Sequence, residues 1–159
     1  MPVPDQEHRT PLQKEVTICL TNLETSVTAR LLWATFAKGV RHNPDQTLDI
    51  LGTVSYVGMM KRPGATSTPD PNEVIAVPMH IYIKIWVDSG HHRLTLGDET
   101  KASNPLYAED FNIGRENNNQ FLAQIDIPVP VLPAASPNVY PIFVDGNQIG
   151  EVPLYVAVL

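Results

Sequence analysis

The sequence has little of several features that would define a chemistry. Cys19 is the single cysteine among 159 residues, so no disulfide can form within one chain. Basic residues are also few: 11 lysines and arginines stand against 17 aspartates and glutamates, which gives a formal net charge of −6. Nucleic acid and anionic membranes attract basic surfaces, so neither is an expected partner. No apolar run approaches the ~18 residues of a membrane-spanning helix.

Motifs of the common enzyme classes are missing as well. The sequence contains no G-x-S-x-G, no P-loop, no G-x-G-x-x-G and no zinc-type Cys/His spacing. His91 and His92 are adjacent, but neighbouring strand residues point to opposite faces, so we expect an exposed turn there and no metal site. Asp88, Asp98 and Glu99 lack the spacing of a calcium loop. We therefore predict no catalytic residues, no cofactor and no metal, with an active site assembled from distant strands as the alternative.

The chain is rich in proline, with 15 residues, which favours short strands and stiff loops over long helices. The strongest strand signal is "HIYIKIWVD", in which Ile81, Ile83, Ile85 and Val87 alternate with polar and aromatic residues. Apolar runs of this kind, separated by turn signals, predict about seven strands. The expected fold is all-β, an antiparallel β-sandwich of the immunoglobulin-like or C2-like kind.

The domain organisation follows from the composition along the chain. Residues 1–14 predict an extended, proline-containing arm, and residues 15–159 a single β-sandwich domain. Strands are expected over 15–20 ("EVTICL", where we expect Cys19 to be a small buried residue), 48–58, 74–88, a segment through Leu94 and Leu96, and 121–129. Two more are expected around a turn at Asp145-Gly146 or Gly146-Asn147. Ser89-Gly90 predicts a hairpin turn, and 98–120 a long polar loop.

The segment 25–39 is ambiguous between helix and strand. As a helix it has Thr25 or Ser26 as its cap and Gly39 as its stop signal. As a strand its apolar residues alternate poorly. We favour the helix here, with the strand as the alternative.

The C-terminal part resembles a known family. "FLAQIDIPVPVLP" followed by "NVYPIFVDGNQIGEVPLYVAV" is similar to the end of an uncharacterised β-sandwich family of bacteria and phages, whose members finish in a "VDG…IG…PL.V" hairpin. "ICLTNLE", "LDILGTVSYV" and "HIYIKIWVDSGHHRLTL" match earlier strands of that family in the same order, with 24–46 and 98–120 as insertions. The resemblance implies a β-sandwich, and it brings no activity and no catalytic residues.

Together these features favour a non-catalytic structural or assembly module, with a virion-associated protein (head decoration, minor capsid or tail) as the best candidate. Its partner would be protein, through self-association or a particle lattice. We expect it in the cytoplasm or in a virion assembled there, since the sequence begins without a signal-peptide pattern. The predicted docking residues are Pro2, Pro4, His8 and Pro11 of the arm and Tyr107, Phe111 and Ile113 of the long loop.

The alternative function is ligand binding. A soluble bacterial β-sandwich would bind a small molecule, glycan or peptide through the loops 58–73, 89–92 and 98–120, with Tyr107 or Trp86 as a stacking platform.

Overall fold

The computed structural model describes residues 28–45, 47–59, 64, 70–97 and 105–158. These residues form nine strands and one short 3-10 helix, η1 (Arg115–Asn117). The strands are β1 (Ala29–His42), β2 (Leu48–Val54), β3 (Tyr56–Met59), β4 (Ile75–Val87), β5 (Gly90–Leu96), β6 (Tyr107–Ile113), β7 (Gln120–Val131), β8 (Asn138–Val144) and β9 (Asn147–Val158). Within the described ranges, no helix is long and apolar enough to cross a membrane. The arm expected over 1–14 and the strand expected over 15–20 lie outside these ranges.

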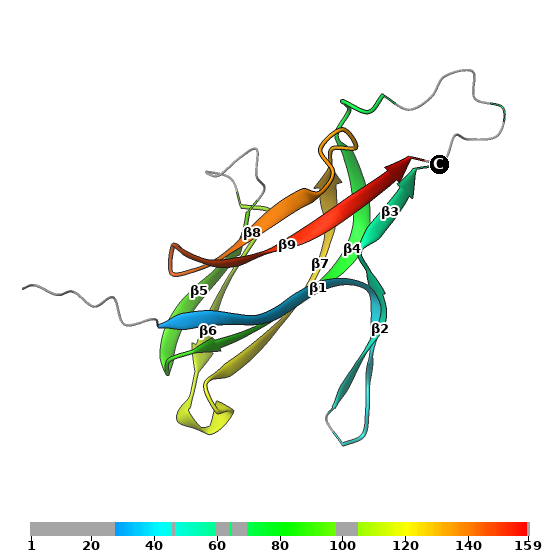
Figure 1. Cartoon of the computed structure of the whole chain (residues 1–159). Coiled ribbons are helices and arrows are strands. Elements are labelled where there is room, and N and C mark those ends of the chain that lie inside the picture. The colour runs from blue at the N-terminus through cyan, green and yellow to red at the C-terminus, as the bar shows by residue number, and fades with distance from the viewer. Residues whose placement is uncertain (1–27, 46, 60–63, 65–69, 98–104, 159) are drawn as a thin grey trace, which may run out of the picture.

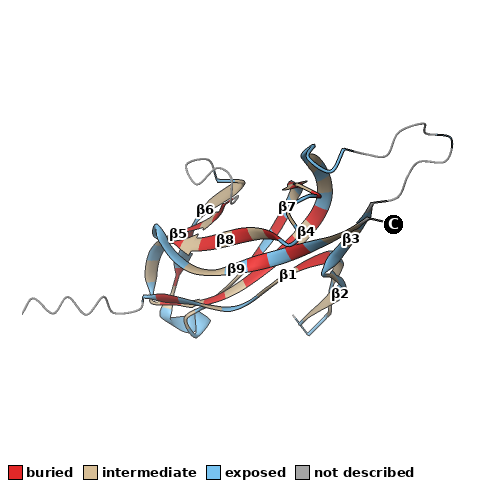
Figure 2. Ribbon diagram, turned by 45° about the horizontal axis from the view of Figure 1, so that its top comes forward, coloured by how far each residue is buried: buried red, intermediate tan, exposed pale blue. Residues whose placement is uncertain are grey.

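The strands build two sheets that face each other, which confirms the predicted β-sandwich (Figure 1). The four-stranded sheet has the order β2-β1-β4-β7, and the five-stranded sheet has the order β3-β9-β8-β5-β6. The pairs are antiparallel except for β3 and β9, which run parallel. Figure 2 shows buried residues alternating with more exposed ones along the strands, as expected when one face of each sheet packs on the core.

The core is centred on β4, the segment with the strongest strand signal in the sequence. Its four alternating residues Ile81, Ile83, Ile85 and Val87 are fully buried. Each such side chain contributes roughly 1.5–3 kcal/mol through the apolar surface that it removes from water. The opposite sheet supplies their partners, which include Leu94, Leu96, Ile142 and Leu154.

The helix expected over 25–39 is wrong for the described part of that segment, because residues 29–42 form β1. A β-bulge explains the poor alternation in the sequence. The register of β1 on β4 shifts between Leu31 and Trp33, so that one extra residue, Leu32, is accommodated. Leu31 and Phe36 can then both pack on the core, while Leu32 and Trp33 stay exposed.

Three further expectations need correction. Ser89-Gly90 does not close a hairpin, because β4 and β5 belong to different sheets and the turn carries the chain from one sheet to the other. The segment 48–58 is two strands, since the chain bends at Ser55 and passes from the four-stranded to the five-stranded sheet. The stretch 98–120 includes a strand, β6, so the polar loop is shorter than predicted.

The closing hairpin is confirmed. β8 and β9 pair in antiparallel fashion around Asp145 and Gly146, whose φ angles are +51° and +80°. Positive φ at both central positions is the requirement of the type I′ turn, which suits Asp-Gly.

The strand prolines lie where no neighbouring strand needs their missing N–H. The N–H of Val87 donates to Asn119 O, so the backbone N–H and C=O groups of odd-numbered residues of β4 point toward β7. The backbone nitrogen of the even-numbered Pro78 therefore points to the other side of β4. That side is open among the described residues, because β1 pairs with β4 only as far as His80. By the same register, Pro128 and Pro130 of β7 face the free edge of the sheet.

The two prolines of the closing hairpin follow the same rule. Tyr155 N–H donates to Ser55 O, so Pro153 also faces the β3 side of β9, before the ladder with β3 begins at Tyr155. Pro141 faces β5 just beyond the last β5 pair, at Ile142. The open side of β9 at Pro153 is therefore weakened as a template for another strand.

Candidate functional site: an apolar sheet face and a cleft

The outer face of the closing hairpin is apolar along β8. Along β8, every second residue from Asn138 to Val144 is buried in the core, so the residues between them point outward. These outward residues of β8 are apolar. On β9 they lie opposite Gln148, Glu151 and Pro153, and Pro153 leads on to two exposed tyrosines. We call the set the hairpin patch. It consists of Val139, Pro141, Phe143, Pro153, Tyr155 and Tyr56.

The two tyrosines of the patch are both exposed. Tyr56 is 65% and Tyr155 38% exposed, and the parallel pairing of β3 with β9 places them side by side. Their ring centroids lie 5.3 Å apart at an interplanar angle of 32°. Exposed aromatic rings are enriched in protein interfaces, where they supply much of the binding energy.

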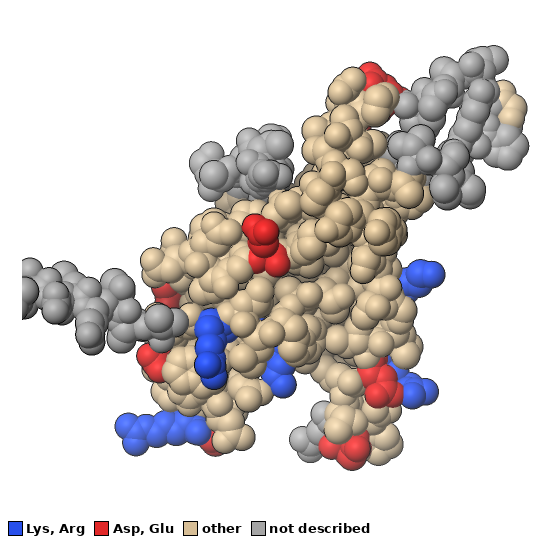
Figure 3. Space-filling model, in the orientation of Figure 1, with Lys and Arg blue, Asp and Glu red and all other residues tan. Residues whose placement is uncertain are grey.

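Charged side chains are sparse on this face. In Figure 3, where β8 and β9 lie toward the viewer, lysine, arginine, aspartate and glutamate are few and scattered. From residue 138 to 158 the chain carries two charged residues, Asp145 at the turn and Glu151 in β9. Depletion of charge is typical of the buried centre of an interface, because desolvating an unpaired charge costs free energy.

A cleft opens beside Tyr56, where β1 separates from β4. β1 pairs with β4 as far as Ala37 and with β2 alone beyond it. The cleft has a volume of about 340 Å³. Its lining is mainly apolar, with Val54, Val57, Val77 and Met79, and its basic groups are Lys38 and His80. His80 lies 2.5 Å from the Asp126 carboxylate. Among the described residues, Lys38 forms no ion pair with a carboxylate.

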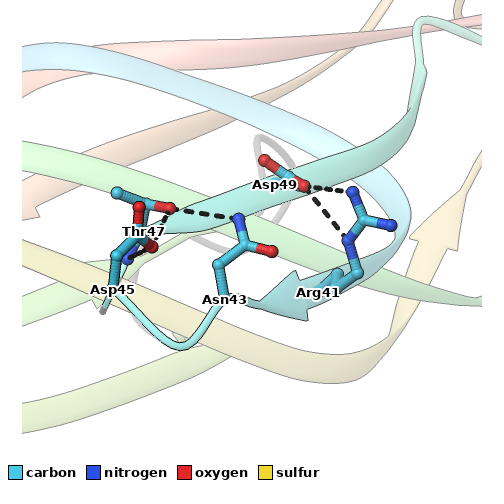
Figure 4. Close-up of polar contacts among 5 residues, drawn as sticks. All are labelled: Arg41, Asn43, Asp45, Thr47 and Asp49. Atoms are coloured by element: carbon cyan, nitrogen blue, oxygen red, sulfur yellow. Dashed lines mark hydrogen bonds and ion pairs between the residues drawn. The ribbon is translucent and has the colours of Figure 1, made fainter.

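Beyond the cleft, β1 and β2 form a ribbon whose tip is tied by side-chain hydrogen bonds (Figure 4). The Thr47 hydroxyl and N–H both donate to Asp45, at 2.6 and 3.0 Å, and Asn43 donates to the Thr47 hydroxyl. Arg41 donates twice to Asp49. The bonds from Thr47 lower the pKa of Asp45, and those from Arg41 and then Asn43 lower the pKa of Asp49. The ribbon is thus a defined projection beside the cleft.

His92 connects two turns of the fold. It lies in β5 and its side chain is 10% exposed, so the exposed turn expected for it is wrong. Its Nδ1 lies 2.7 Å from Asp145 Oδ2, and its Nε2 lies 2.8 Å from Asp88 O. Burial raises the pKa of Asp145, but the hydrogen bonds from His92 and from the Arg93 N–H outweigh it, so this pKa is lowered. The contact joins the β4–β5 turn to the closing hairpin.

The structure does not support docking through two of the predicted residues. Phe111 and Ile113 are 8% and 3% exposed, because the segment forms β6 and these residues face the core. Tyr107 is half-buried and donates to Glu109 at 2.8 Å. Burial and this contact raise its pKa to about 12. The arm residues Pro2, Pro4, His8 and Pro11 lie outside the described residues.

The proposed stacking platform at Trp86 is already covered. The Arg30 guanidinium lies over its ring, 5.4 Å from the centroid. Among the described residues, no group of three or more His, Cys, Asp or Glu is placed to hold a metal ion. Two of the carboxylates considered for calcium, Asp98 and Glu99, lie outside these residues.

The hairpin patch was not predicted as a site, although the sequence contains a signal for it. "NVYPIFV" is apolar at both alternating sets of positions. In a sandwich strand with one face in solvent, inward residues are apolar and outward residues are polar. Two apolar faces therefore indicate that the outer face is also covered.

No protein-family model matches this chain, and no curated protein matches it. The resemblance of the C-terminal part to a bacterial and phage β-sandwich family therefore stays a prediction.

Proposed function

We propose that this protein is a non-catalytic assembly module that associates with a second copy of itself through the hairpin patch. The observation that carries the proposal is the row of apolar residues on the outer face of β8, which continues through Pro153 to the exposed pair Tyr56 and Tyr155.

Charge favours a second copy as the occupant. Each chain has a net charge of −6, so two copies repel at most orientations. The charge-poor face in Figure 3 is where they approach at the lowest electrostatic cost. A C2 contact uses the same patch on both chains, and apolar patches are complementary to themselves.

Native mass, measured by light scattering after size exclusion at micromolar concentration, tests the proposal. We expect a dimer or a larger closed species, and loss of association on Tyr155→Ser or Phe143→Ser. Leu32→Ser is the matched control, since Leu32 is 39% exposed but lies on β1, outside the patch. A monomer at all concentrations up to about 100-fold above the starting one refutes self-association, and so does equal weakening by the control.

At a finer level we propose that the assembly is a particle, with a virion head or tail as the best candidate and the cytoplasm as the place of assembly. Support comes from the same patch together with the projecting β1–β2 ribbon, which offers a second contact surface on another side. Co-sedimentation of the protein with purified particles, lost in Tyr155→Ser, tests this level separately.

The cleft favours a second candidate function, binding of a small amphiphilic carboxylate. Its volume of about 340 Å³ lies in the range of ligand sites, and apolar walls beside Lys38 suit an apolar group that carries one negative charge. Isothermal titration calorimetry with a medium-chain fatty acid should show binding, and Lys38→Met should weaken it. Equal binding of the corresponding alcohol argues against it.

A further inference from the structure

The outer face of the four-stranded sheet carries both tryptophans of the chain. Ile81, Ile83 and Ile85 of β4 are fully buried, so the residues between them point outward. Residues paired across neighbouring strands lie on the same face, so the register extends this surface onto β1 and β7. We call it the tryptophan face. It consists, row by row from β1 through β4 to β7, of Arg30, Trp86 and Gln120; Trp33, Lys84 and Leu122; Thr35, Tyr82 and Gln124; and Ala37, His80 and Asp126.

One tryptophan is open and the other is covered by a cation. Trp33 is 37% exposed, which leaves its ring accessible. The Arg30 guanidinium lies over the Trp86 ring, 5.4 Å from its centroid. A stacked guanidinium keeps the N–H donors at its edge, so Arg30 is held in place and can still bind an anion. Lys84 lies opposite Trp33 in the register, at the usual cross-strand Cβ distance of about 4.5–5.5 Å. The open indole therefore has a lysine beside it and an arginine in the next row.

The arginine and the lysine of this face have no carboxylate partner among the described residues. Ion pairs in that part of the chain involve other basic groups, namely Arg41, His80, His92 and Arg93. The carboxylate of the face itself, Asp126, contacts His80. The whole chain has a net charge of −6, so two such cations beside an exposed ring are a local reversal of charge that attracts an anion.

The shape and polarity of the face favour a chain of sugars. Small ligands bind in concave sites that bury most of their surface, whereas an open sheet face suits a polymer that makes several weak contacts along it. The exposed amides of Gln120 and Gln124 provide donors and acceptors for hydroxyl groups. The C–H face of a pyranose ring is apolar and packs on an indole ring. Nucleic acid is a poorer match, because it carries a charge on every phosphate and few cations are available here.

We propose that the tryptophan face binds an acidic glycan, a chain of sugars in which some rings carry a carboxylate. Trp33 packs on such a ring, and Lys84 and Arg30 bind its carboxylate through charge-assisted hydrogen bonds. Gln120 and Gln124 bind hydroxyl groups of the neighbouring sugars. The hairpin patch lies on the outer face of the other sheet, so this proposal does not rest on self-association.

Tryptophan fluorescence reports on this face alone, because Trp33 and Trp86 are the two tryptophans of the chain. Full-length protein is titrated with trigalacturonate and with a hyaluronan oligosaccharide, and maltotriose is the neutral comparison. We expect at least one acidic glycan to change the emission and to bind about tenfold more tightly than maltotriose, since charge-assisted hydrogen bonds are stronger than neutral ones. Raising the salt concentration from ~0.05 to ~0.5 M should weaken this binding, because exposed charges are screened.

Isothermal titration calorimetry assigns the site in variants. Trp33→Ala and Lys84→Met should each weaken binding of the acidic glycan about tenfold, while Trp33→Tyr, which keeps an aromatic ring, retains most of the affinity. Arg93→Met is the matched control, since it also removes one positive charge, but from an exposed position on β5 in the other sheet. Its affinity should stay within about twofold of the native chain. Urea midpoints check that the variants are folded, and Lys84→Met carries the test if Trp33→Ala is not.

Several results overturn the proposal. They are the absence of binding by both acidic glycans up to about 10 mM, equal binding of maltotriose, and equal weakening by Arg93→Met and Lys84→Met. A triglutamate peptide that binds as tightly as the glycans also overturns it, and assigns the face to an acidic segment of a partner protein. Glycan binding is measured whatever the native mass of the protein, so failure of this proposal and failure of self-association are distinguishable.

Discussion

Replacing Asn138 should destabilise the fold more than its small size suggests. Asn138 is 8% exposed and is the buried polar residue of the described chain. Its side chain accepts from Leu132 N–H at 2.8 Å and donates to Leu132 O at 3.0 Å and to Ala135 O at 2.6 Å. These three bonds fix the crossover between β7 and β8, which includes a cis Ser136-Pro137 bond.

The magnitude follows from the number of bonds. Asn138→Leu keeps the branching of the side chain but removes all three hydrogen bonds, each worth about 1 kcal/mol net, and leaves backbone groups of the crossover without partners. We expect a loss of about 3 kcal/mol in the free energy of unfolding. For a chain of this size that lowers the urea midpoint by roughly 1–2 M without changing the m-value.

Equilibrium urea unfolding, followed by tryptophan fluorescence, measures this loss. Asn112→Leu is the matched control, since Asn112 is exposed on β6, and its effect should stay within about 0.5 kcal/mol. If Asn138→Leu costs less than about 1 kcal/mol, the view that this side chain organises the crossover is refuted.

Two more predictions concern contacts between distant elements. The pKa of Asp145 is lower in the folded state than in the unfolded state, so its ionised form stabilises the fold. This stability is present above the pKa of the unfolded state and is lost as pH falls through the pKa of the folded state. Asp145→Asn should therefore flatten the stability profile below about pH 4, as measured by urea midpoints across pH; an unchanged slope contradicts the role of the His92 contact. Gly150→Ala should destabilise by about 1–3 kcal/mol, because its Cβ would overlap Leu31 Cδ2, and thermal unfolding without a shift would show that Leu31 moves aside freely.

The sequence predicted those elements whose pattern is local. The alternation from Ile81 to Val87 identified a strand with one aliphatic face, since a period of two over many residues is typical of a half-buried strand. Asp145-Gly146 identified the closing turn, because positive φ at both positions is cheap there.

The other elements depend on contacts between strands that are far apart in the sequence. The bulge after Leu31 disguises β1, since one extra residue breaks the alternation that a strand should show. Ser89-Gly90 has hairpin chemistry, yet the turn passes between sheets, because the next strand pairs with β6 and β8. A tight turn specifies a reversal of the chain, and it does not specify which neighbour each strand chooses.

Prolines show how such information is present in the sequence and becomes readable only with the register. Pro78, Pro128 and Pro153 look alike in the sequence, as interruptions of apolar runs. Once pairing is known, each lies where its missing N–H faces an open edge. The prolines therefore indicate which side of a strand is open, and the pairing register is needed to interpret them.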